Sequence, residues 1–450
     1  MVRSRLLAPL LVMSVIACSP ESPSGASGDA LWFEGARLIV GDGTSPIENA
    51  AFLVEGESFT WVGRVGEREA PAGAVRVDLT GKTVIPALID GHNHIGLTDV
   101  RDGTSNQANY TRDNLVDQLQ RYAYYGVSAA LSMGLEADQA LAYRLRDEVI
   151  GDAALFLTVG KGIAATPMAG PQTEARLGIP YGAATAEEGR QRVRELNSQG
   201  VRFVKIWVDD RGAAVPKLQP QVYRAIIDEA HSLGMQVLAH LGSTTGLEDA
   251  KDLYRAGVDG FVHTVRDRDV DEEYLTLVRE HADVWTGPNM PASPLTRDDL
   301  ASLSETLPAD QIARMRAGIE RREAEGNMEP SASFQLHCRN LRRIHDAGMI
   351  LGLGTDGTGD AFGVHMEMAD YTKCGLTAHE ALVAASGTNA RILGLDRMGT
   401  VEAGKSADFV ILDANPLDDI TNTRRISAVY LRGDNVDRAT LRSRWTGTMP

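Results

Sequence analysis

The chain has 450 residues, of which 43% are hydrophobic and 24% are charged, as is usual for a globular protein with a large buried core. Its formal net charge of −16 disfavours nucleic acid as a partner, and a well-solvated acidic surface is the simplest explanation of that charge. The three cysteines, Cys18, Cys338 and Cys374, are too few for a disulfide framework, and their spacing fits no zinc motif.

The first residues have the pattern of an export signal. Arg3 and Arg5 precede an apolar stretch that is too short to span a bilayer. Residues 15–18 resemble the end of a bacterial lipoprotein signal, which implies that Cys18 is lipidated and anchors the protein to a membrane on the periplasmic side of the bacterial cell envelope. The alternative is an ordinary signal peptide with an incidental cysteine. We therefore expect a signal peptide over residues 1–17 and a flexible linker, rich in Ser, Pro and Gly, over residues 18–30.

The two ends of the remaining chain share short strand-like segments separated by turns. Three such segments lie within residues 31–84, and two more, 407–412 and 426–431, lie within residues 397–450. The region between them has a different pattern of strands and helices. We therefore expect the two ends to pair into one β-sandwich.

The middle of the chain, residues 85–396, alternates strand-like and helix-like segments. Eight strands can be counted, from the one that ends at His92 to the one over residues 349–356. Eight alternating units predict a closed (β/α)8 TIM barrel, and an open doubly wound sheet is the alternative. A charged, helical stretch at residues 293–322 could either cap the barrel mouth or form a solvated insertion.

Polar residues at the strand ends are the first functional signal. His92 and His94 end the first barrel strand and, two residues apart, project from the same face. Active sites of such barrels lie at the carboxyl ends of the strands, so polar residues that end different strands should converge. All the candidates are of types compatible with a metal site. They are His92, His94, Lys205, His240, His263 and Asp356.

The remaining histidines test this interpretation. His231, His281, His337 and His345 lie in helical segments before a strand, and we expect them on the outside of the barrel. His365, after the last strand, is ambiguous.

Lys205 lies inside an apolar strand, and an ammonium group cannot bind a metal. Burial lowers the pKa of a lysine, which allows the neutral amine to react with CO2 and form an anionic carbamate that can bridge two metals. The alternative is an ion pair with Asp209 or Asp210.

Several stretches of the chain carry a family resemblance. They are residues 86–94, 203–206, 229–234, 257–263, 352–356 and 399–408. Together they are similar to the amidohydrolase superfamily, in the branch of imidazolonepropionase-like proteins and metal-dependent Xaa-Pro dipeptidases, over about residues 31–437. The resemblance implies a barrel with a flanking β-sandwich and two divalent metal ions, with zinc as the expected metal.

The same resemblance implies a division of the ligands. His92, His94 and Asp356 would hold one metal, His240 and His263 the other, and carboxylated Lys205 would bridge them. The chain departs from the family at Ala87, where Gly is usual, and at residues 163–170, where relatives often carry a Gly-Gly-His that contacts substrate. The substrate pocket is therefore expected to differ from that of the dipeptidases.

Two such metals would activate a bridging water, and Asp356 would accept its proton and pass it to the leaving amine. The expected reaction is hydrolysis of the C–N bond of a small N-acyl amino acid, peptide-like or aryl amide substrate. An ester, lactone, carbamate or phosphotriester could be attacked at the same site. A surface lipoprotein that binds metal or ligand without catalysis is the alternative of another class.

Five residues near strand ends are candidates for substrate contact, each weighed against a plain packing role. They are Trp207, Arg266, Asn289, Met290 and His365. The sequence also allows self-association into a homo-oligomer.

Overall fold

The computed structural model describes residues 30–166, 173, 175–212, 214–290, 293–357, 359 and 361–447. The predicted signal peptide and Cys18 lie outside the described residues, as do residues 167–170 of the segment after the third barrel strand. Within the described part of the chain, no helix is long and apolar enough to cross a membrane.

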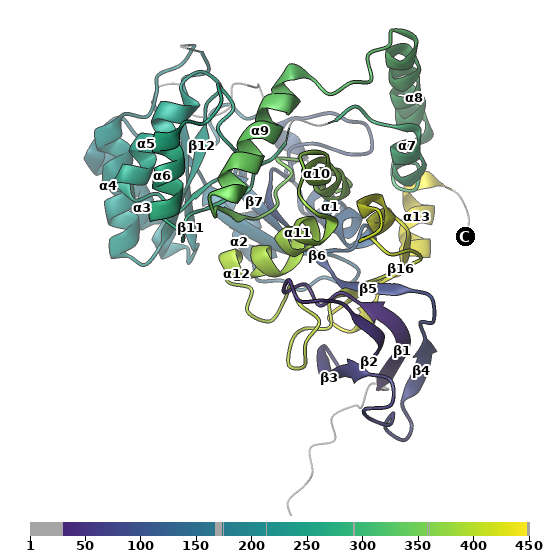
Figure 1. The fold of residues 1–450 in the computed structure, drawn as a ribbon. Helices are drawn as coiled ribbons and strands as arrows, with labels where there is room; N and C mark the ends of the chain where they lie inside the picture. Colours follow the sequence, from purple (N-terminus) through teal and green to yellow (C-terminus); the bar gives the residue numbers. More distant parts are fainter. Residues whose placement is uncertain are drawn as a thin grey trace, which may run out of the picture.

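The two ends of the chain form one eight-stranded sheet, seen at the lower right of Figure 1. The strands run in the order β18-β17-β16-β5-β1-β2-β3, with β4 beside β1. The antiparallel pairing of β5 with β16 joins the two ends, as the sequence predicts. The strands are β1 (Leu31–Leu38), β2 (Ile47–Glu55), β3 (Ser58–Arg64), β4 (Val75–Asp78), β5 (Thr83–Pro86), β16 (Phe409–Leu412), β17 (Ile426–Leu431) and β18 (Asp434–Asn435).

Aromatic side chains fill the core of this sheet. The ring of Phe409 lies 4.7 Å from that of Tyr430 and 5.2 Å from that of Phe33. The sheet curls around these rings, since Ser58 at the start of β3 forms a bridge with Ser406 just before β16. One curled sheet therefore stands where we expected a sandwich of two sheets.

The middle of the chain alternates parallel strands with helices, which confirms the predicted α/β class. The strands are β6 (Leu88–Asn93), β7 (Val127–Gly134), β8 (Leu155–Lys161), β9 (Ile163–Ala164), β10 (Tyr181–Gly182), β11 (Phe203–Val208), β12 (Gln236–Leu241), β13 (Gly260–Phe261), β14 (Trp285–Thr286) and β15 (Ile350–Leu351). The helices are α1 (Arg112–Tyr124), α2 (Gln139–Arg146), α3 (Ala186–Ser198), α4 (Pro220–Ser232), α5 (Gly246–Ala256), α6 (Glu272–Glu280), α9 (Ala332–Asp346), α10 (Gly363–Lys373), α11 (Ala378–Val383) and α12 (Asn389–Leu393). Most strand residues are buried, because helices cover the outer faces of the strands (Figure 1).

These strands form two parallel sheets, β6-β7-β8 and β10-β9-β11-β12-β13-β14-β15. The chain passes from β8 through Gly162 directly into β9, and β9 pairs with β11. At the other junction, the Gly91 amide donates to the Leu353 carbonyl (2.9 Å) and the Thr355 amide to the His92 carbonyl (2.9 Å). Hydrogen bonds thus connect the segment after β15 to β6, the strand that carries the first two histidines.

The charged insertion forms α7 (Arg297–Leu303) and α8 (Ala309–Ala324), at the upper right of Figure 1. Its Gln311 side chain donates to the Val100 carbonyl (2.7 Å), in the loop that follows His94. The insertion therefore contacts a loop beyond the first strand end and is not wholly solvated.

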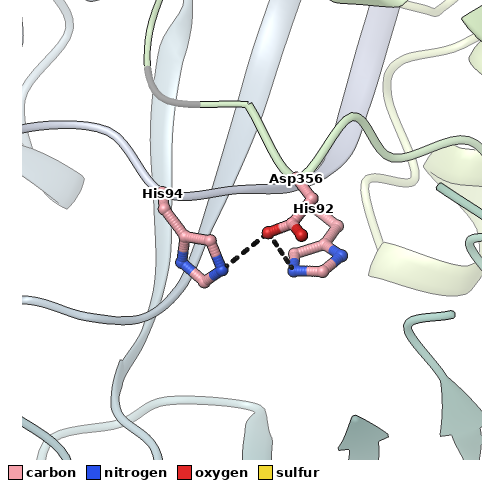
Figure 2. A group of neighbouring side chains, drawn as sticks. All are labelled: His92, His94 and Asp356. Carbon is pink, nitrogen blue, oxygen red and sulfur yellow. Dashed lines mark ion pairs between the residues drawn. The ribbon is translucent and has the colours of Figure 1, made fainter. Parts of the chain in front are cut away.

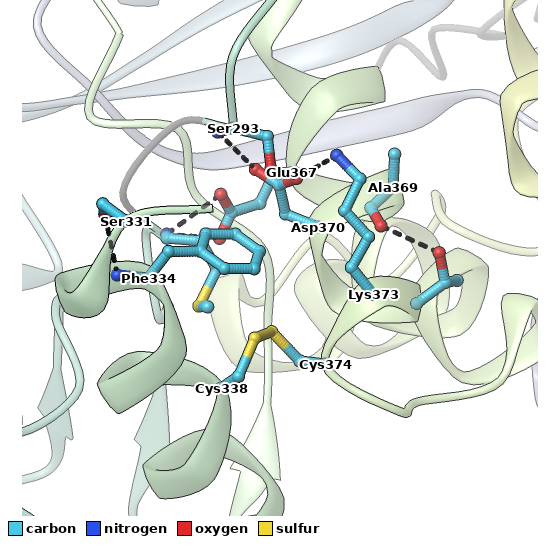
Figure 3. The surroundings of a disulfide bond; sticks show 11 residues. Ser293, Ser331, Phe334, Cys338, Glu367, Ala369, Asp370, Lys373 and Cys374 are labelled. Atoms are coloured by element: carbon cyan, nitrogen blue, oxygen red, sulfur yellow. Dashed lines mark hydrogen bonds and ion pairs between the residues drawn. A yellow bond between two sulfur atoms is a disulfide. The ribbon is translucent and has the colours of Figure 1, made fainter. Parts of the chain in front are cut away.

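A disulfide joins Cys338 on α9 to Cys374 at the end of α10, with the two Cα atoms 4.6 Å apart (Figure 3). The three cysteines predicted no disulfide framework, and this single bridge was not predicted. The two cysteines are 36 residues apart in the chain and meet only because α9 and α10 are brought together by the fold.

Candidate metal centre

Three of the predicted ligands form one group at the end of β6 and the segment after β15 (Figure 2). The Nε2 atoms of His94 and His92 lie 3.0 Å and 3.6 Å from one carboxylate oxygen of Asp356. The potential ligand atoms of the three residues all lie within 4.8 Å of one another. This spacing suits three side chains that share one cation.

The backbone around this group is closely constrained. The His92 carbonyl accepts hydrogen bonds from the amides of Thr355 (2.9 Å) and Asp356 (2.8 Å). A Cβ atom at Gly354 would lie 2.5 Å from the Cβ of His92, so only glycine lets the two segments approach this closely. Asp356 itself has φ of 50°, a left-handed conformation that is uncommon for non-glycine residues and more frequent for Asp and Asn than for other types.

Asp90, within residues 86–94, is a positioning residue that was not predicted from the sequence. Its buried carboxylate accepts hydrogen bonds from the Thr355 hydroxyl (2.7 Å), the Tyr122 hydroxyl (3.0 Å) and the His92 amide (3.1 Å). Burial raises the pKa of Asp90 to about 6, although these hydrogen bonds oppose the shift. A carboxylate inside an apolar strand was the signal that could have identified it, because such a group needs partners.

The second pair consists of His240, at the end of β12, and His263, after β13. The Nδ1 atom of His240 lies 2.8 Å from the Nε2 atom of His263. The ring centroid of His263 is 5.4 Å from that of His92, so the two groups of ligands are adjacent.

The outer nitrogen of His240 has two neighbours. Its Nε2 atom lies 3.1 Å from an amino group of Arg266 and 3.4 Å from a carboxylate oxygen of Asp209. A guanidinium can only donate, so Nε2 accepts from Arg266 as the side chains stand. If a cation took the Nδ1 lone pair, Nε2 would carry the proton, and Asp209 would be the acceptor that orients the ring.

Lys205 is completely buried between the two groups. Its ammonium has no carboxylate partner among the described residues, and its Nζ atom lies 3.7 Å from the Met133 sulfur. Burial lowers the pKa of Lys205 to about 7, a shift that Asp356 opposes and Arg266 reinforces. The charge of Lys205 in turn lowers the pKa of both His92 and His240, after the larger effect of their burial, which places it near both pairs.

The alternative ion pair of Lys205 is absent among the described residues. Asp209 instead pairs with Arg211 at 3.0 Å, and Asp210 accepts a hydrogen bond from the Gly212 amide at 3.0 Å.

The ring nitrogens at this site fit a metal. Buried nitrogens without a hydrogen-bond partner include both of His92, Nδ1 of His94 and Nδ1 of His263. Burial is the largest cause that lowers the pKa of these histidines, so their rings are neutral and keep a free lone pair. Neutral imidazoles with one carboxylate are a donor set that divalent zinc accepts.

Three of the five candidate substrate residues lie near this site, where hydrogen bonds or burial give each of them a structural role. The Asn289 side chain donates to the Thr355 carbonyl (2.7 Å) and so supports the segment of Asp356. The Met290 amide donates to the Glu367 carboxylate (3.0 Å), and its side chain is buried. The indole of Trp207 is buried against Gly162 and lies over the Lys205 ammonium, 5.4 Å from it, so it forms a wall of the site.

His365 does not belong to the site. Its two ring nitrogens are occupied by the Tyr125 carbonyl (2.9 Å) and the Thr423 hydroxyl (3.0 Å). It therefore joins α10 to α1 and the C-terminal segment, and neither ring nitrogen is free to contact a substrate.

Two of the four helical histidines lie outside the strands, as expected, and a third is buried. His231 pairs with Asp259 (2.9 Å) and His345 with Glu380 (3.4 Å) at partly exposed positions outside the strands. His337 is only 3% exposed, and burial together with the charge of Arg266 lowers its pKa to about 4. It lies on the face of α9 that packs on the loop after β13, where Asn340 donates to the Val265 carbonyl (2.8 Å).

Comparisons with known proteins agree with this geometry. Residues 83–436 match the Amidohydrolase family. An imidazolonepropionase of Deinococcus radiodurans is 27% identical over 410 residues, covering 86% of this chain and 92% of the relative.

Solved structures show the same fold. A putative prolidase from Bifidobacterium longum is 25% identical with a TM-score of 0.68, covering 91% of this chain and 95% of its own. Molinate hydrolase is 22% identical with a TM-score of 0.70, covering 92% and 95%. The match to the family extends over most of the chain and includes every predicted metal ligand, so this protein belongs to the amidohydrolase family.

Proposed function

We propose that this protein is a binuclear metal-dependent hydrolase that cleaves the C–N bond of a small N-acyl amino acid, peptide-like or aryl amide substrate. The observation that carries the proposal is the adjacency of two ligand groups, His92 with His94 and Asp356, and His240 with His263, around one buried lysine. Amidohydrolase family membership and the names of the relatives, an imidazolonepropionase and a prolidase among them, support C–N bond hydrolysis.

The fold that we propose for this site is a closed eight-stranded (β/α)8 barrel. The continuous passage from β8 into β9 and the hydrogen bonds between β6 and the segment after β15 support closure at both junctions. In a closed barrel, the carboxyl ends of the strands surround one point, which is where the ligands meet.

The chain's own residues would divide the chemistry as follows. Divalent cations held by these ligands would acidify a water and polarise the scissile carbonyl. Asp356 would accept a proton from the attacking water and deliver it to the leaving nitrogen. Burial alone would raise the pKa of Asp356, but its hydrogen bond with His94 and its electrostatic interactions with the neighbouring histidines hold that pKa well below its usual range. The carboxylate is therefore ionised at neutral pH.

Lys205 would act as a carbamate. Its neutral amine attacks CO2, forming an N–C bond and releasing one proton, and the product carries a negative charge between the two groups of ligands. The absence of a carboxylate partner among the described residues supports this, since a buried ammonium would otherwise stay unpaired.

The experiment is hydrolysis by the zinc-loaded protein of a panel of N-acyl amino acids, dipeptides, aryl amides, lactones and aryl esters. Turnover of at least one amide well above the esters and lactones is the expected result. Preference for an ester or lactone would replace the amide assignment. Zinc-loaded protein that turns over nothing on the panel would favour the non-catalytic alternative.

We further propose that the protein works outside the cytoplasm, anchored by a lipid on Cys18. The Cys338–Cys374 disulfide supports an oxidising compartment, in which such bonds form and persist. Cys18→Ala should release the protein from the membrane fraction, and retention of that variant in membranes would count against lipidation.

A further inference from the structure

Three arginines lie on three different loops near the proposed metal centre. Arg176 precedes β10, Arg211 follows β11 and Arg266 follows β13. The charges of Arg211 and Arg266 act on His240, and that of Arg176 acts on His94. Each of the three also lies within electrostatic reach of the centre at Asp356 or Lys205. Arg266 is the one in direct contact, with an amino group 3.1 Å from Nε2 of His240.

Negative charge to match them is scarce. Arg211 is paired with Asp209 at 3.0 Å. Arg266 donates to the Leu241 carbonyl (2.9 Å) and lies beside His240, and its buried Nε has no partner. In the part of the chain that the structure describes, no carboxylate lies within ion-pair distance of Arg266 or Arg176.

A neighbouring residue shows what an ordinary surface arginine does here. Arg268, two residues after Arg266, has a side chain that is 56% exposed and paired with Asp267 at 2.8 Å. Arg266 is more enclosed and still lacks such a partner. Partly buried guanidinium groups are costly unless they are paired, so their position at a reaction centre indicates an anionic ligand.

Two further buried polar groups accompany Arg266. The Thr264 hydroxyl, on the same loop, and Nδ1 of His337, a residue within electrostatic reach of Arg266, have no hydrogen-bond partner. Both side chains are almost completely buried. Unsatisfied buried groups of this kind are rare in folded proteins and call for an explanation.

We propose that Arg266, assisted by Arg176 and Arg211, binds a carboxylate carried by the substrate, so that the enzyme selects anionic amides over neutral ones. This inference rests on the proposed function. A guanidinium presents two parallel N–H groups that match the two oxygens of a carboxylate. Because Asp209 already neutralises Arg211, the unpaired Arg266 is the main contact, and Arg176 adds attraction from the His94 side.

The test compares two probes that differ only in charge, N-acetyl-L-phenylalanine and N-acetyl-L-phenylalaninamide. Binding of each is measured by calorimetry with zinc-loaded and with zinc-free protein. We expect the carboxylate to bind at least about tenfold more tightly than the amide to the wild type. Arg266→Gln should remove most of this preference, Arg266→Lys should keep part of it, and Arg176→Gln should reduce it less. Arg268→Gln is the matched control and should leave it unchanged.

Equal binding of the two probes to the wild type, or the same preference in all the arginine variants, would overturn the proposal. If inorganic phosphate competes with the probes more strongly than acetate does, the group that this site recognises is a phosphate and not a carboxylate. If the Arg266→Gln variant loses zinc, the Arg176→Gln variant becomes the deciding test. No hydrogen bond joins Arg176 to a predicted metal ligand among the described residues, so this variant should keep its zinc. If the protein hydrolyses nothing on the panel but still binds the carboxylate probe more tightly than the amide probe, the proposed function is wrong and the anion-binding site stands.

Discussion

The terminal sheet and the strand-end face of the barrel both bury their side chains, but those side chains are of opposite kinds. In the sheet, Phe33, Phe52 and Phe409 pack ring against ring. At the strand ends, His92 and Lys205 are equally buried, yet His92 has ring nitrogens without partners and Lys205 has no counter-charge among the described residues. Burial of rings stabilises a fold, whereas burial of unpaired polar groups costs free energy that only a ligand can recover. The terminal sheet therefore serves stability and the strand-end face serves chemistry. Variants in the sheet should lower the free energy of unfolding but not turnover, and variants at the strand ends should do the reverse.

The largest effect is expected at the strand-end face. Asp356→Asn should lower turnover by about 10³-fold or more, because an amide cannot accept the proton of the attacking water. The free energy of unfolding should change by no more than about 1 kcal/mol, since the substitution preserves shape. Steady-state kinetics and urea unfolding measure the two quantities, with Asp346→Asn, an exposed carboxylate paired with Arg342, as the control. Near-normal turnover would remove Asp356 as the proton carrier.

The matching variant in the terminal sheet is Phe409→Ala. Its ring contacts Phe33, Phe52, Phe59 and Tyr430, so we expect the free energy of unfolding to fall by about 3–5 kcal/mol. The turnover of the protein that remains folded should stay at the wild-type value. Phe409→Leu should lose less stability. If Phe409→Ala lost as much turnover as Asp356→Asn and kept its stability, the proposed difference between the two regions would be wrong.

A smaller, pH-dependent effect is expected from Glu136, a buried carboxylate just after β7 that accepts a hydrogen bond from Thr158 at 2.7 Å. Burial raises its pKa from 4.5 to about 7. Between these pH values the folded protein keeps a proton that the unfolded chain releases, so this contribution to stability is present at low pH and is lost as the pH rises. Glu136→Gln has no such dependence.

The measurement is urea unfolding of the wild type and Glu136→Gln at pH 5 and pH 7. The wild type should lose on the order of 1–3 kcal/mol more than the variant between the two pH values. Parallel behaviour of the two proteins would show that Glu136 titrates normally in the fold.

The parts predicted from the sequence are those that local pattern determines. The alternation of strands and helices marked the middle of the chain, and His240, His263 and Asp356 were identified because each ends a strand. Pairing of the two terminal segments was predicted because both consist of short strand-like segments separated by turns. All of these depend on position along a strand, which sequence periodicity reports.

The parts that were missed depend on contacts between elements. His337 was expected outside the barrel, but the inner face of α9 packs on the loop after β13. Cys338 and Cys374 meet only in the folded chain, and His365 is held by α1 and the C-terminal segment. Arg176 and Arg211 carry no motif, and their relation to the centre is visible only once three separate loops are placed around it.

The central claim is that the two groups of ligands hold two metal ions bridged through Lys205, and metal analysis of the purified protein tests it most directly. The wild type should contain about two zinc ions per chain, and Lys205→Ala no more than about one. One ion per chain in the wild type, or two in Lys205→Ala, would contradict the account.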